Sequence, residues 1–391
     1  MKKKLKIGIF LDSYYPAVDG VVVVVDNLAR CLSKDNDVVV VVPYTNTIDK
    51  DSEKAYRIIR IASSPVMFTE YRLGHVKTKF SKLYKDLYNE KFDIIHIHSP
   101  FTIGRLGQKL ARDLNIPCIA TMHTRFDYEI RRLVKSEYVV KRVIKQLIKV
   151  YNKCDRCIAI NKAMIKVFKD YGYKYKPVVI HNGTDLKPIS NNSQYVKETK
   201  EKYHLDNSTP TLLFVGRIID VKNIFFLLDV LKALKDDNYK FKMIYVGTGP
   251  DLNKLKKKIN EYNMDNDIIL AGRIMDRHEL AAIYKVSDLF LFPSLFDASS
   301  LVQIEAAVNE TPGLFIEKSV TADTINNEVD GYTCRLDVNT YKNKIIEILS
   351  DKKKLKEVSI NAKLLLGKSW EEISEETNEL YLKEINKSKK K

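Results

Sequence analysis

Short runs of β-branched and other apolar residues alternate with amphipathic stretches along most of the chain. In the first half these runs predict strands at 5–11, 37–43, 93–98, 118–123, 156–160 and 177–183. In the second half they predict strands at 211–216, 242–247, 268–272, 289–293 and 313–316. Strands that alternate with helical stretches are typical of parallel α/β sheets. The run of valines after Gly20 is followed by apolar positions at helical spacing, so we expect a helix there.

A polar segment rich in turn formers, residues 186–210, separates the two sets of strands. We therefore predict an α/β protein with two doubly wound, Rossmann-like domains that face each other across a cleft: 1–188, then 189–368. The last segment, 369–391, begins at Ser369, which can cap a helix, and carries Glu371 and Glu372 in the first turn. It predicts a helix of about 18 residues.

Composition excludes several classes of protein. The chain has 391 residues, 45% hydrophobic and 30% charged, as in ordinary globular proteins. No apolar run approaches the roughly 20 residues that cross a bilayer, and the basic first residues run into a strand without a cleavage site, so we expect a cytoplasmic protein. The five cysteines are scattered, and the Cys154–Cys157 pair has no second pair at zinc spacing, which predicts buried thiols.

Positive charge is concentrated in the first half of the chain. Residues 1–190 contain 35 Lys and Arg against 19 Asp and Glu, whereas residues 191–391 contain 31 of each. This distribution indicates an anionic partner, either nucleic acid or an acidic membrane surface. A lysine-rich solvated surface is the alternative, although it predicts a more even spread. Nucleic acid is the weaker candidate, because no recognisable binding module is present.

Ligands of open α/β sheets bind beyond the carboxyl ends of the strands, which makes the residues after each strand candidates. Gly216, Arg217 and Lys222 follow one strand of the second half, and two cations there suit a diphosphate. Glycine turns also follow the next two strands, which favours close approach of a nucleotide. The residues of these turns are Gly247, Gly249, Gly272 and Arg273.

The stretch "FDASSLVQIEAA", residues 296–307, places Asp297 in the loop after a strand and Glu305 inside the following helix. A helix that begins at Leu301 and is capped by Ser299 or Ser300 has an N-terminus that can bind an anion. We expect one carboxylate to accept hydrogen bonds from sugar hydroxyls and the other from ribose hydroxyls.

These motifs resemble, in order and interval, the donor half of family-4 retaining glycosyltransferases of the GT-B fold. They are G-R-x4-K at 216–222, V-G-x-G-P at 246–250, G-R at 272–273, and the acidic pair eight residues apart at 297 and 305. The first half resembles the same family in "YYPAVDGVV", "DIIHIHSPF", "TMHTRFD" and "HNGTDL", and the C-terminal "SWEE" helix resembles one that crosses back to the first domain. The wording of "HTRFDYEIRR" is similar to bacterial enzymes that add glucose to diacylglycerol.

The resemblance implies a role for each candidate residue. Arg217 and Lys222 would hold the donor diphosphate, and Gly20 would let backbone amides approach its distal phosphate. Glu305 would contact the ribose, Asp297 the transferred sugar and His123 its outer hydroxyls. Ile274, after Arg273, would read the base through its backbone. The implied enzyme is a retaining hexosyltransferase that works by front-face displacement and needs no metal or other cofactor.

Two Asp-Asn-Asp triplets, at 35–37 and 265–267, have the spacing of metal-binding motifs. Both precede a predicted strand, at the wrong end of the sheet, and therefore predict turns.

The segment 131–151 is basic and, from Val140 on, amphipathic at helical spacing. Such a helix can lie on an anionic membrane, although a core helix with a solvated face would show the same pattern. A second lysine- and aromatic-rich helix is expected at 77–91. We predict a lipid acceptor at the inner membrane face, with the membrane or acceptor contacts made by Arg131, Arg132, Lys141, Arg142, Lys145 and Lys149.

Two alternatives stay open. The acceptor can instead be a soluble glycan or a wall-polymer precursor. The protein can also bind a nucleotide sugar without turnover, because Asp297 and the Ala-Ser-Ser after it stand where the family usually has Glu and Pro-Phe-Gly.

Overall fold

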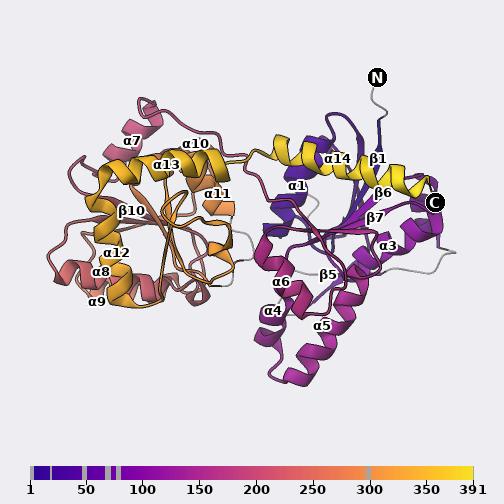
Figure 1. Ribbon diagram of the computed structural model, residues 1–391, viewed down its shortest axis with the longest axis horizontal. Coiled ribbons are helices and arrows are strands. Elements are labelled where there is room, and N and C mark those ends of the chain that lie inside the picture. Colours follow the sequence, from indigo (N-terminus) through magenta and orange to yellow (C-terminus); the bar gives the residue numbers. More distant parts are fainter. Residues whose placement is uncertain are drawn as a thin grey trace. The chain divides into compact units, whose positions relative to one another are not determined.

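In the computed structural model, the chain forms two compact units (Figure 1). Unit 1 comprises Met1–Gly183 and Ser369–Lys391, and unit 2 comprises Thr184–Lys368. The structure describes residues 4–17, 20–45, 51–66, 72–75, 81–295, 297 and 301–390, Arg132 without its side chain. Of the predicted site residues, Ser299 and Ser300 lie outside the described part.

Unit 1 is built on a parallel sheet with the strand order β3-β2-β1-β6-β7-β8-β9 among the described residues. Its strands are β1 (Lys6–Phe10), β2 (Asp37–Pro43), β3 (Arg57–Ile61), β6 (Ile94–Ile97), β7 (Cys118–Met122), β8 (Arg156–Ala159) and β9 (Val178–Val179). Two short antiparallel strands, β4 (Ser63–Pro65) and β5 (Arg72–Gly74), form a separate ribbon. The valines of β2 are buried throughout, as expected of a parallel strand covered on both faces.

The helices of unit 1 include one from the far end of the chain. They are α1 (Gly20–Leu32), α2 (Lys82–Asn89), α3 (Thr102–Leu114), α4 (Phe126–Leu133), α5 (Glu137–Tyr151), α6 (Lys162–Asp170) and α14 (Trp370–Ser388), with the 3-10 turn η1 (Asp51–Glu53). Helix α3 packs on β1, β6 and β7. Helix α14, yellow in Figure 1, packs beside α1.

Unit 2 has a parallel sheet with the strand order β12-β11-β10-β13-β14-β15 among its described residues. The strands are β10 (Thr211–Val215), β11 (Lys242–Val246), β12 (Ile268–Gly272), β13 (Leu289–Phe292), β14 (Gly313–Ile316) and β15 (Tyr332–Cys334). The helices are α7 (Gln194–Lys202), α8 (Ile224–Asp236), α9 (Leu252–Glu261), α10 (Arg277–Val286), α11 (Leu301–Val308), α12 (Val338–Ser350) and α13 (Lys352–Leu366). Two 3-10 turns, η2 (Asp220–Lys222) and η3 (Thr321–Thr324), complete it.

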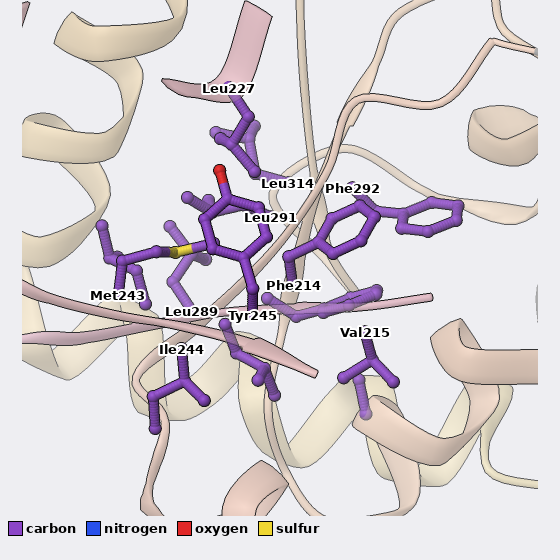
Figure 2. Close-up of a cluster of buried hydrophobic side chains, with 14 of the residues drawn as sticks. Phe214, Val215, Leu227, Met243, Ile244, Tyr245, Leu289, Leu291, Phe292 and Leu314 are labelled. Carbon is purple, nitrogen blue, oxygen red and sulfur yellow. The ribbon is translucent and has the colours of Figure 1, made fainter. Parts of the chain in front are cut away.

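The core of unit 2 lies against the central strands. Figure 2 shows Phe214 and Phe292, from the neighbouring strands β10 and β13, beside the Tyr245 ring of β11. The Phe214 and Phe292 rings are stacked with centroids 5.9 Å apart. Because these strands end at the loops that carry the candidate donor residues, this packing fixes where those loops begin.

The predicted fold class is confirmed: both sheets are parallel and covered by helices. The eleven predicted strands are present, and the helix predicted from Gly20 is α1. Of the helix expected at 77–91, residues 82–89 form α2, and residues 77–80 lie outside the described part. The predicted C-terminal helix is α14, in which Ser369 and Glu372 form a reciprocal capping box.

Sequence patterns missed β3, β4, β5 and β15. Strand β3 lies at the edge of its sheet and carries Arg57 and Arg60, so its polar residues hide the strand pattern. Its Arg60 side chain is nonetheless held, since Nε and Nη2 donate to the two carboxylate oxygens of Asp51 at 2.6 and 2.8 Å.

Candidate functional site

The loops after β10 and β13 meet at the point where the strand order of the unit 2 sheet reverses. A topological switch point of this kind is where open α/β sheets bind ligands. Gly216, Arg217 and Lys222 follow β10, and Asp297 follows β13. The sequence placed these residues at two strand ends, and the structure brings Lys222 and Asp297 into contact.

Lys222 and Asp297 form an ion pair, in which Lys222 Nζ lies 2.8 Å from Oδ1 and 3.0 Å from Oδ2. Ser294 Oγ donates a further hydrogen bond to Oδ2 of the same carboxylate. The ammonium group also lies 5.0 Å from the centroid of the Phe292 ring, within the range of a cation–π contact. The cation and the carboxylate are therefore held side by side on the ends of two central strands.

The backbone of the β10 loop is held by Asn223. This residue adopts a left-handed conformation with φ of 56°, and its side-chain amide donates to the Pro293 carbonyl at 2.8 Å. Because Pro293 follows β13 directly, this hydrogen bond ties the two loops together. Arg217 projects from the same loop with an exposed side chain.

The glycines of the neighbouring loops are required by packing within the protein. A Cβ on Gly247 would lie 1.9 Å from the Gly216 carbonyl oxygen, and one on Gly249 would lie 2.2 Å from the Ile218 oxygen. The loops also share backbone hydrogen bonds, among them Ile218 N to Thr248 O at 2.9 Å. Close approach of two loops thus accounts for these glycines, where the sequence suggested close approach of a ligand.

Glu305 lies in α11 and is 8% exposed. Arg277 Nη2 donates to its Oε1 at 2.9 Å, and the Tyr284 hydroxyl donates to its Oε2 at 3.0 Å. Burial raises the pKa of Glu305, while the nearby Arg277 guanidinium opposes this shift. Arg277 Nη2 also pairs with Asp185 at 2.6 Å.

Arg277 was missed by the sequence reading, which singled out Arg273. Arg273 is exposed beyond β12, after Gly272 with φ of 70°, and Ile274 packs against the unit 2 core. Arg277 is the first residue of α10, directly after the N-cap Asp276, and follows Arg273 by four residues. The signal was present in the second arginine of "GRIMDR".

The anion-binding helix start predicted before Glu305 is described only from Leu301, the first residue of α11. Gly20 is the first residue of α1 in unit 1, and a Cβ at this position would meet nothing within 4 Å. The proposed contacts of Leu301 and Gly20 with donor phosphates therefore stay predictions.

In unit 1, the predicted His123 belongs to a cluster of three buried histidines. A hydrogen bond of 2.9 Å joins His123 Nε2 to His98 Nδ1, and the His98 and His96 ring centroids are 4.1 Å apart. His96 in turn bonds the Tyr381 hydroxyl of α14 at 2.7 Å and Thr121 Oγ1 at 2.7 Å. Burial lowers the pKa of His96 and of His123 to about 3, so both rings are neutral near pH 7.

His96 and His98 were quoted in the sequence motif but given no role. They are two residues apart at the end of β6, where a strand places alternate side chains on one face. His123 follows the neighbouring strand β7. The i, i+2 spacing of His96 and His98, together with the position of His123 after a neighbouring parallel strand, was therefore the signal that could have predicted the cluster.

The start of helix α3 is occupied by a side chain of the protein itself. The buried Asp12 carboxylate accepts from Ile103 N at 2.7 Å, Gly104 N at 3.1 Å and Ser99 Oγ at 2.6 Å. Burial raises the pKa of Asp12, and these hydrogen bonds oppose the shift. Asp12 thus joins the end of β1 to α3, as a carboxylate at a helix N-terminus does.

The basic segment 131–151 contains the last residues of α4, the connection 134–136 and the whole of α5. Its apolar face is buried in unit 1, as a core helix requires, with Val140, Ile144, Leu147, Ile148 and Tyr151 covered. Lys141, Arg142, Lys145 and Lys149 are exposed. The expectation that this apolar face lies on a membrane is therefore wrong, because the face is buried in unit 1.

The exposed apolar residues of this segment lie where α4 ends and α5 begins. They are Leu133, Tyr138 and Val139, with Tyr138 72% exposed. Arg131 donates to Glu137 at 2.7 and 3.1 Å and to Asp127 at 3.2 Å, so its charge is paired within the protein. The Arg132 side chain lies outside the described part.

Other predicted features have clear positions. The five cysteines are free and buried, as predicted. Both Asp-Asn-Asp triplets lie in turns that lead into β2 and β12. Within the described residues, no group of three or more His, Cys, Asp or Glu side chains is arranged to hold a metal ion. Helices with the length and apolarity needed to cross a membrane are also absent from the described part.

Two family models match the chain in succession. Residues 18–188 match Glycosyltransferase Family 4, and residues 196–365 match Glycosyl transferases group 1. The α-monoglucosyldiacylglycerol synthase of Streptococcus pneumoniae is 30% identical over 315 residues, 79% of this chain and 70% of that protein. The enzyme of the same name from Acholeplasma laidlawii is 25% identical over 99% of both chains.

A third relative differs in its named acceptor. The UDP-Gal:α-D-GlcNAc-diphosphoundecaprenol α-1,3-galactosyltransferase of Escherichia coli is 28% identical over 79% of this chain and 78% of its own. Among solved structures, Anabaena HepE in complex with UDP and glucose superposes with a TM-score of 0.75 at 16% identity, covering 96% of this chain and 99% of that one. Together with the two parallel-sheet units, these matches show that the chain belongs to the GT-B glycosyltransferases built from a family-4 N-terminal domain and a group-1 C-terminal domain.

Proposed function

We propose that the protein transfers a glucosyl group from UDP-glucose to a membrane lipid such as diacylglycerol. The observation that carries this proposal is its similarity to two α-monoglucosyldiacylglycerol synthases, one aligned over 99% of this chain. The donor base, the hexose and the acceptor are all part of the proposal.

The Lys222–Asp297 pair suits a nucleotide sugar. In our proposal Lys222 and Arg217 hold the diphosphate, and Asp297 accepts a hydrogen bond from the adjacent sugar. The phosphate and the sugar carbon of the donor are joined through a single oxygen, so their protein partners must also be neighbours. The 2.8 Å contact between Lys222 Nζ and Asp297 Oδ1 supports that arrangement.

Glu305 is the proposed ribose contact. Both of its oxygens accept hydrogen bonds from Arg277 and Tyr284, and each carboxylate oxygen has a second lone pair for a ribose hydroxyl. The two protein donors thus fix the carboxylate without using all its accepting capacity. Ile274, Gly247, Gly249 and the N–H groups from Leu301 on complete the proposed donor set.

The proposed reaction retains the configuration of the sugar by front-face displacement. The bond from the sugar carbon to the diphosphate oxygen breaks, and the acceptor oxygen bonds to the same face. The acceptor proton passes to the departing diphosphate oxygen, so no dedicated base is required. The positive groups stabilise the charge that develops on the diphosphate, and no metal ion is part of the proposal.

His123 is proposed to hold hydroxyls of the transferred sugar. With a pKa of about 3 its ring is neutral, so it offers a hydrogen bond and no charge. His98, bonded to His123 Nε2, fixes the ring orientation.

For the acceptor, we propose that the tip of α4 and α5 contacts the inner face of the cytoplasmic membrane. Leu133, Tyr138 and Val139 are exposed there. The cations Lys141, Arg142 and Lys145 follow on the outer face of α5. Apolar residues that enter the interface beside lysines that attract acidic lipids are typical of peripheral membrane binding.

A second acceptor is favoured by one observation. The Escherichia coli relative is named for transfer to a sugar on diphosphoundecaprenol, a lipid-linked precursor. Transfer to such a precursor would use the same donor residues with a different acceptor. A nucleotide-sugar-binding protein without turnover is the remaining alternative.

The test is to incubate the full chain with UDP-glucose, or with GDP-mannose as control, and vesicles that contain diacylglycerol and an anionic lipid. Release of nucleoside diphosphate that requires both UDP-glucose and diacylglycerol would support the proposal. Release only with an undecaprenol-linked sugar would transfer support to the second acceptor. Donor binding without any release would favour the binding protein.

A further inference from the structure

A pocket of about 260 Å³ lies between α3 and α5 of unit 1, and its walls are strongly basic. Arg105, Lys109 and Arg112 line it from α3, while Lys149 and Lys153 line it from the end of α5 and the turn after it. No carboxylate is among its lining residues within the described part of the chain. We call it the α3–α5 pocket. None of its residues belongs to unit 2.

The cations converge because of their spacing. On α3 they recur at i, i+4 and i+7, which places them on one face of the helix. The last turn of α5 and the turn after it place Lys149 and Lys153 at the same pocket. Arg112 is largely exposed, with 70% of its side chain accessible, so its charge is available to a ligand.

The two walls are held together beneath the pocket by Gln108. Its amide nitrogen donates to the Val150 carbonyl at 2.7 Å and contacts Cys154 Sγ at 3.2 Å. The Val150 carbonyl belongs to the last turn of α5 and also accepts a hydrogen bond from Lys153 N at 3.1 Å. The separation of the two basic faces is therefore fixed by the fold.

Neighbouring acids are engaged elsewhere. Asp113 accepts a hydrogen bond from the Tyr84 hydroxyl and lines a different pocket. Asp155 accepts from the Cys118 backbone N–H at 2.9 Å. The Arg112 Nε group is 3.8 Å from Asp113 Oδ1, which is at the limit of an ion pair.

A simpler explanation of the cluster is that cations near helix C-termini stabilise the helices by complementing the helix dipole. That explanation does not account for the number of charges here. Two helix C-termini supply about −0.5 charge each and Asp113 supplies −1 beside Arg112, which still leaves a net charge of about +3 from the five cations. A basic, concave surface with this excess concentrates anions from solution.

We propose that the α3–α5 pocket is an anion-binding site, separate from the donor residues, for a ligand that carries a phosphate monoester or diphosphate group. The pocket volume of about 260 Å³ is below the 300–1,000 Å³ or so of a typical drug-sized site, which suits a compact phosphate headgroup. The same chemistry is found in soluble phosphates and in the headgroup of a lipid such as phosphatidic acid. The proposal does not depend on the identity of the sugar donor or acceptor.

The experiment compares two double variants of the full chain with equal changes of charge. Lys109→Gln/Lys153→Gln removes two cations from the pocket, and Lys166→Gln/Lys169→Gln removes two exposed cations from α6 of the same unit. Binding of pyrophosphate is measured by calorimetry, and binding of phosphatidylcholine vesicles with and without phosphatidic acid by co-sedimentation. Pyrophosphate bound by the donor residues of unit 2 contributes equally to both variants and cancels in the comparison.

We expect the pocket variant to bind at least one of the two probes about tenfold more weakly than the control variant, because two phosphate contacts are lost. Weaker binding of pyrophosphate by the pocket variant would identify a soluble ligand. Weaker binding only of the vesicles with phosphatidic acid would identify a lipid headgroup. Hydrogen exchange of 105–114 and 146–153 in the unmodified protein should slow with the probe that binds. Equal binding by the two variants, or no saturable binding of either probe, would overturn the proposal.

Discussion

The ion pair between Lys222 and Asp297 joins two loops that are 75 residues apart in the sequence. Each residue could be predicted as a candidate from its place after a strand, and the resemblance to a family gave each a role. Their direct contact could not be predicted, because it depends on the neighbouring positions of β10 and β13 in the sheet. Arg217 is different, since its side chain is exposed and its proposed role rests on its position after β10 and on the family resemblance.

Substituting Arg217 with Ala should lower turnover by about two or more orders of magnitude, the scale of removing one electrostatic stabiliser from a reaction site. The measurement is the rate of nucleoside diphosphate release at saturating donor. Arg335→Ala is the matched control, because Arg335 is 79% exposed and lies in the same unit. An Arg217→Ala enzyme as active as the control would contradict the proposal that this loop holds the diphosphate.

Glu305 offers a test of the buried hydrogen-bond network in unit 2. Glu305→Gln leaves one carbonyl oxygen where two carboxylate oxygens accepted from Arg277 and Tyr284, and it brings an N–H group against a donor. We expect the free energy of unfolding in urea to fall by about 1–3 kcal/mol.

Tyr284→Phe is the companion variant, since it removes a single hydrogen bond and should cost about 1 kcal/mol. A Glu305→Gln protein that is more stable than the unmodified one would mean that the burial of the carboxylate, which raises its pKa, outweighs its hydrogen bonds.

At the scale of elements, the central strands could be predicted because they are short, apolar and rich in β-branched residues. Edge elements could not. Strand β3 is partly exposed and carries two arginines, and β15 is only three residues long, too short for a strand pattern. In the basic segment 131–151 helical spacing was predicted only from Val140, whereas α5 begins at Glu137 and the chain is extended at Val134 between α4 and α5. No proline or glycine marks that break. The sequence also did not show what the apolar face of α5 packs against, because that depends on which elements lie beside the helix in the fold.

The histidines at the ends of β6 and β7 make unit 1 sensitive to acid. In the folded chain His96 and His123 have pKa values of about 3, lowered from 6.5, so the unfolded chain binds protons first as pH falls. Their contribution to stability is complete above pH 6.5 and is lost as the pH approaches 3. As the pH falls from 6.5 to 4.5, each of these two histidines should lower the free energy of unfolding by about 2 kcal/mol.

Urea unfolding at several values between pH 6.5 and 4.5 measures this slope in a window above the titration of most carboxylates. His123→Gln should flatten it, while His278→Gln, at an exposed residue of α10, should not. Identical slopes in the unmodified protein and in His123→Gln would contradict a neutral, buried His123.

At the scale of the whole molecule, the end of the chain returns to unit 1. Trp370 of α14 is 1% exposed, the Tyr381 hydroxyl bonds His96, and Glu384 pairs with Arg156 at 3.1 Å. Unit 2 is thus an insertion in the chain of unit 1. Its first and last residues are joined by a hydrogen bond of 2.9 Å from Thr184 N to Lys368 O.

A fragment of residues 184–368 should therefore fold alone. It keeps its sheet and its apolar core, and its two ends are adjacent in the folded state. We expect a single cooperative thermal transition by circular dichroism.

Residues 1–183 are the matched control, because they lack α14 and should not melt cooperatively. Cooperative melting of 1–183, or its absence in 184–368, would contradict this division of stability.

The return of α14 also separates the order of synthesis from the order of assembly. A ribosome must translate the 185 residues of unit 2 before the last helix of unit 1 emerges. At about 5–20 residues per second this takes roughly 10 to 40 s. During that interval the nascent unit 1 exposes the surface of α1 that α14 later covers, and His96 lacks Tyr381. Chaperones that hold unfinished domains would have their longest opportunity to bind this protein at that stage.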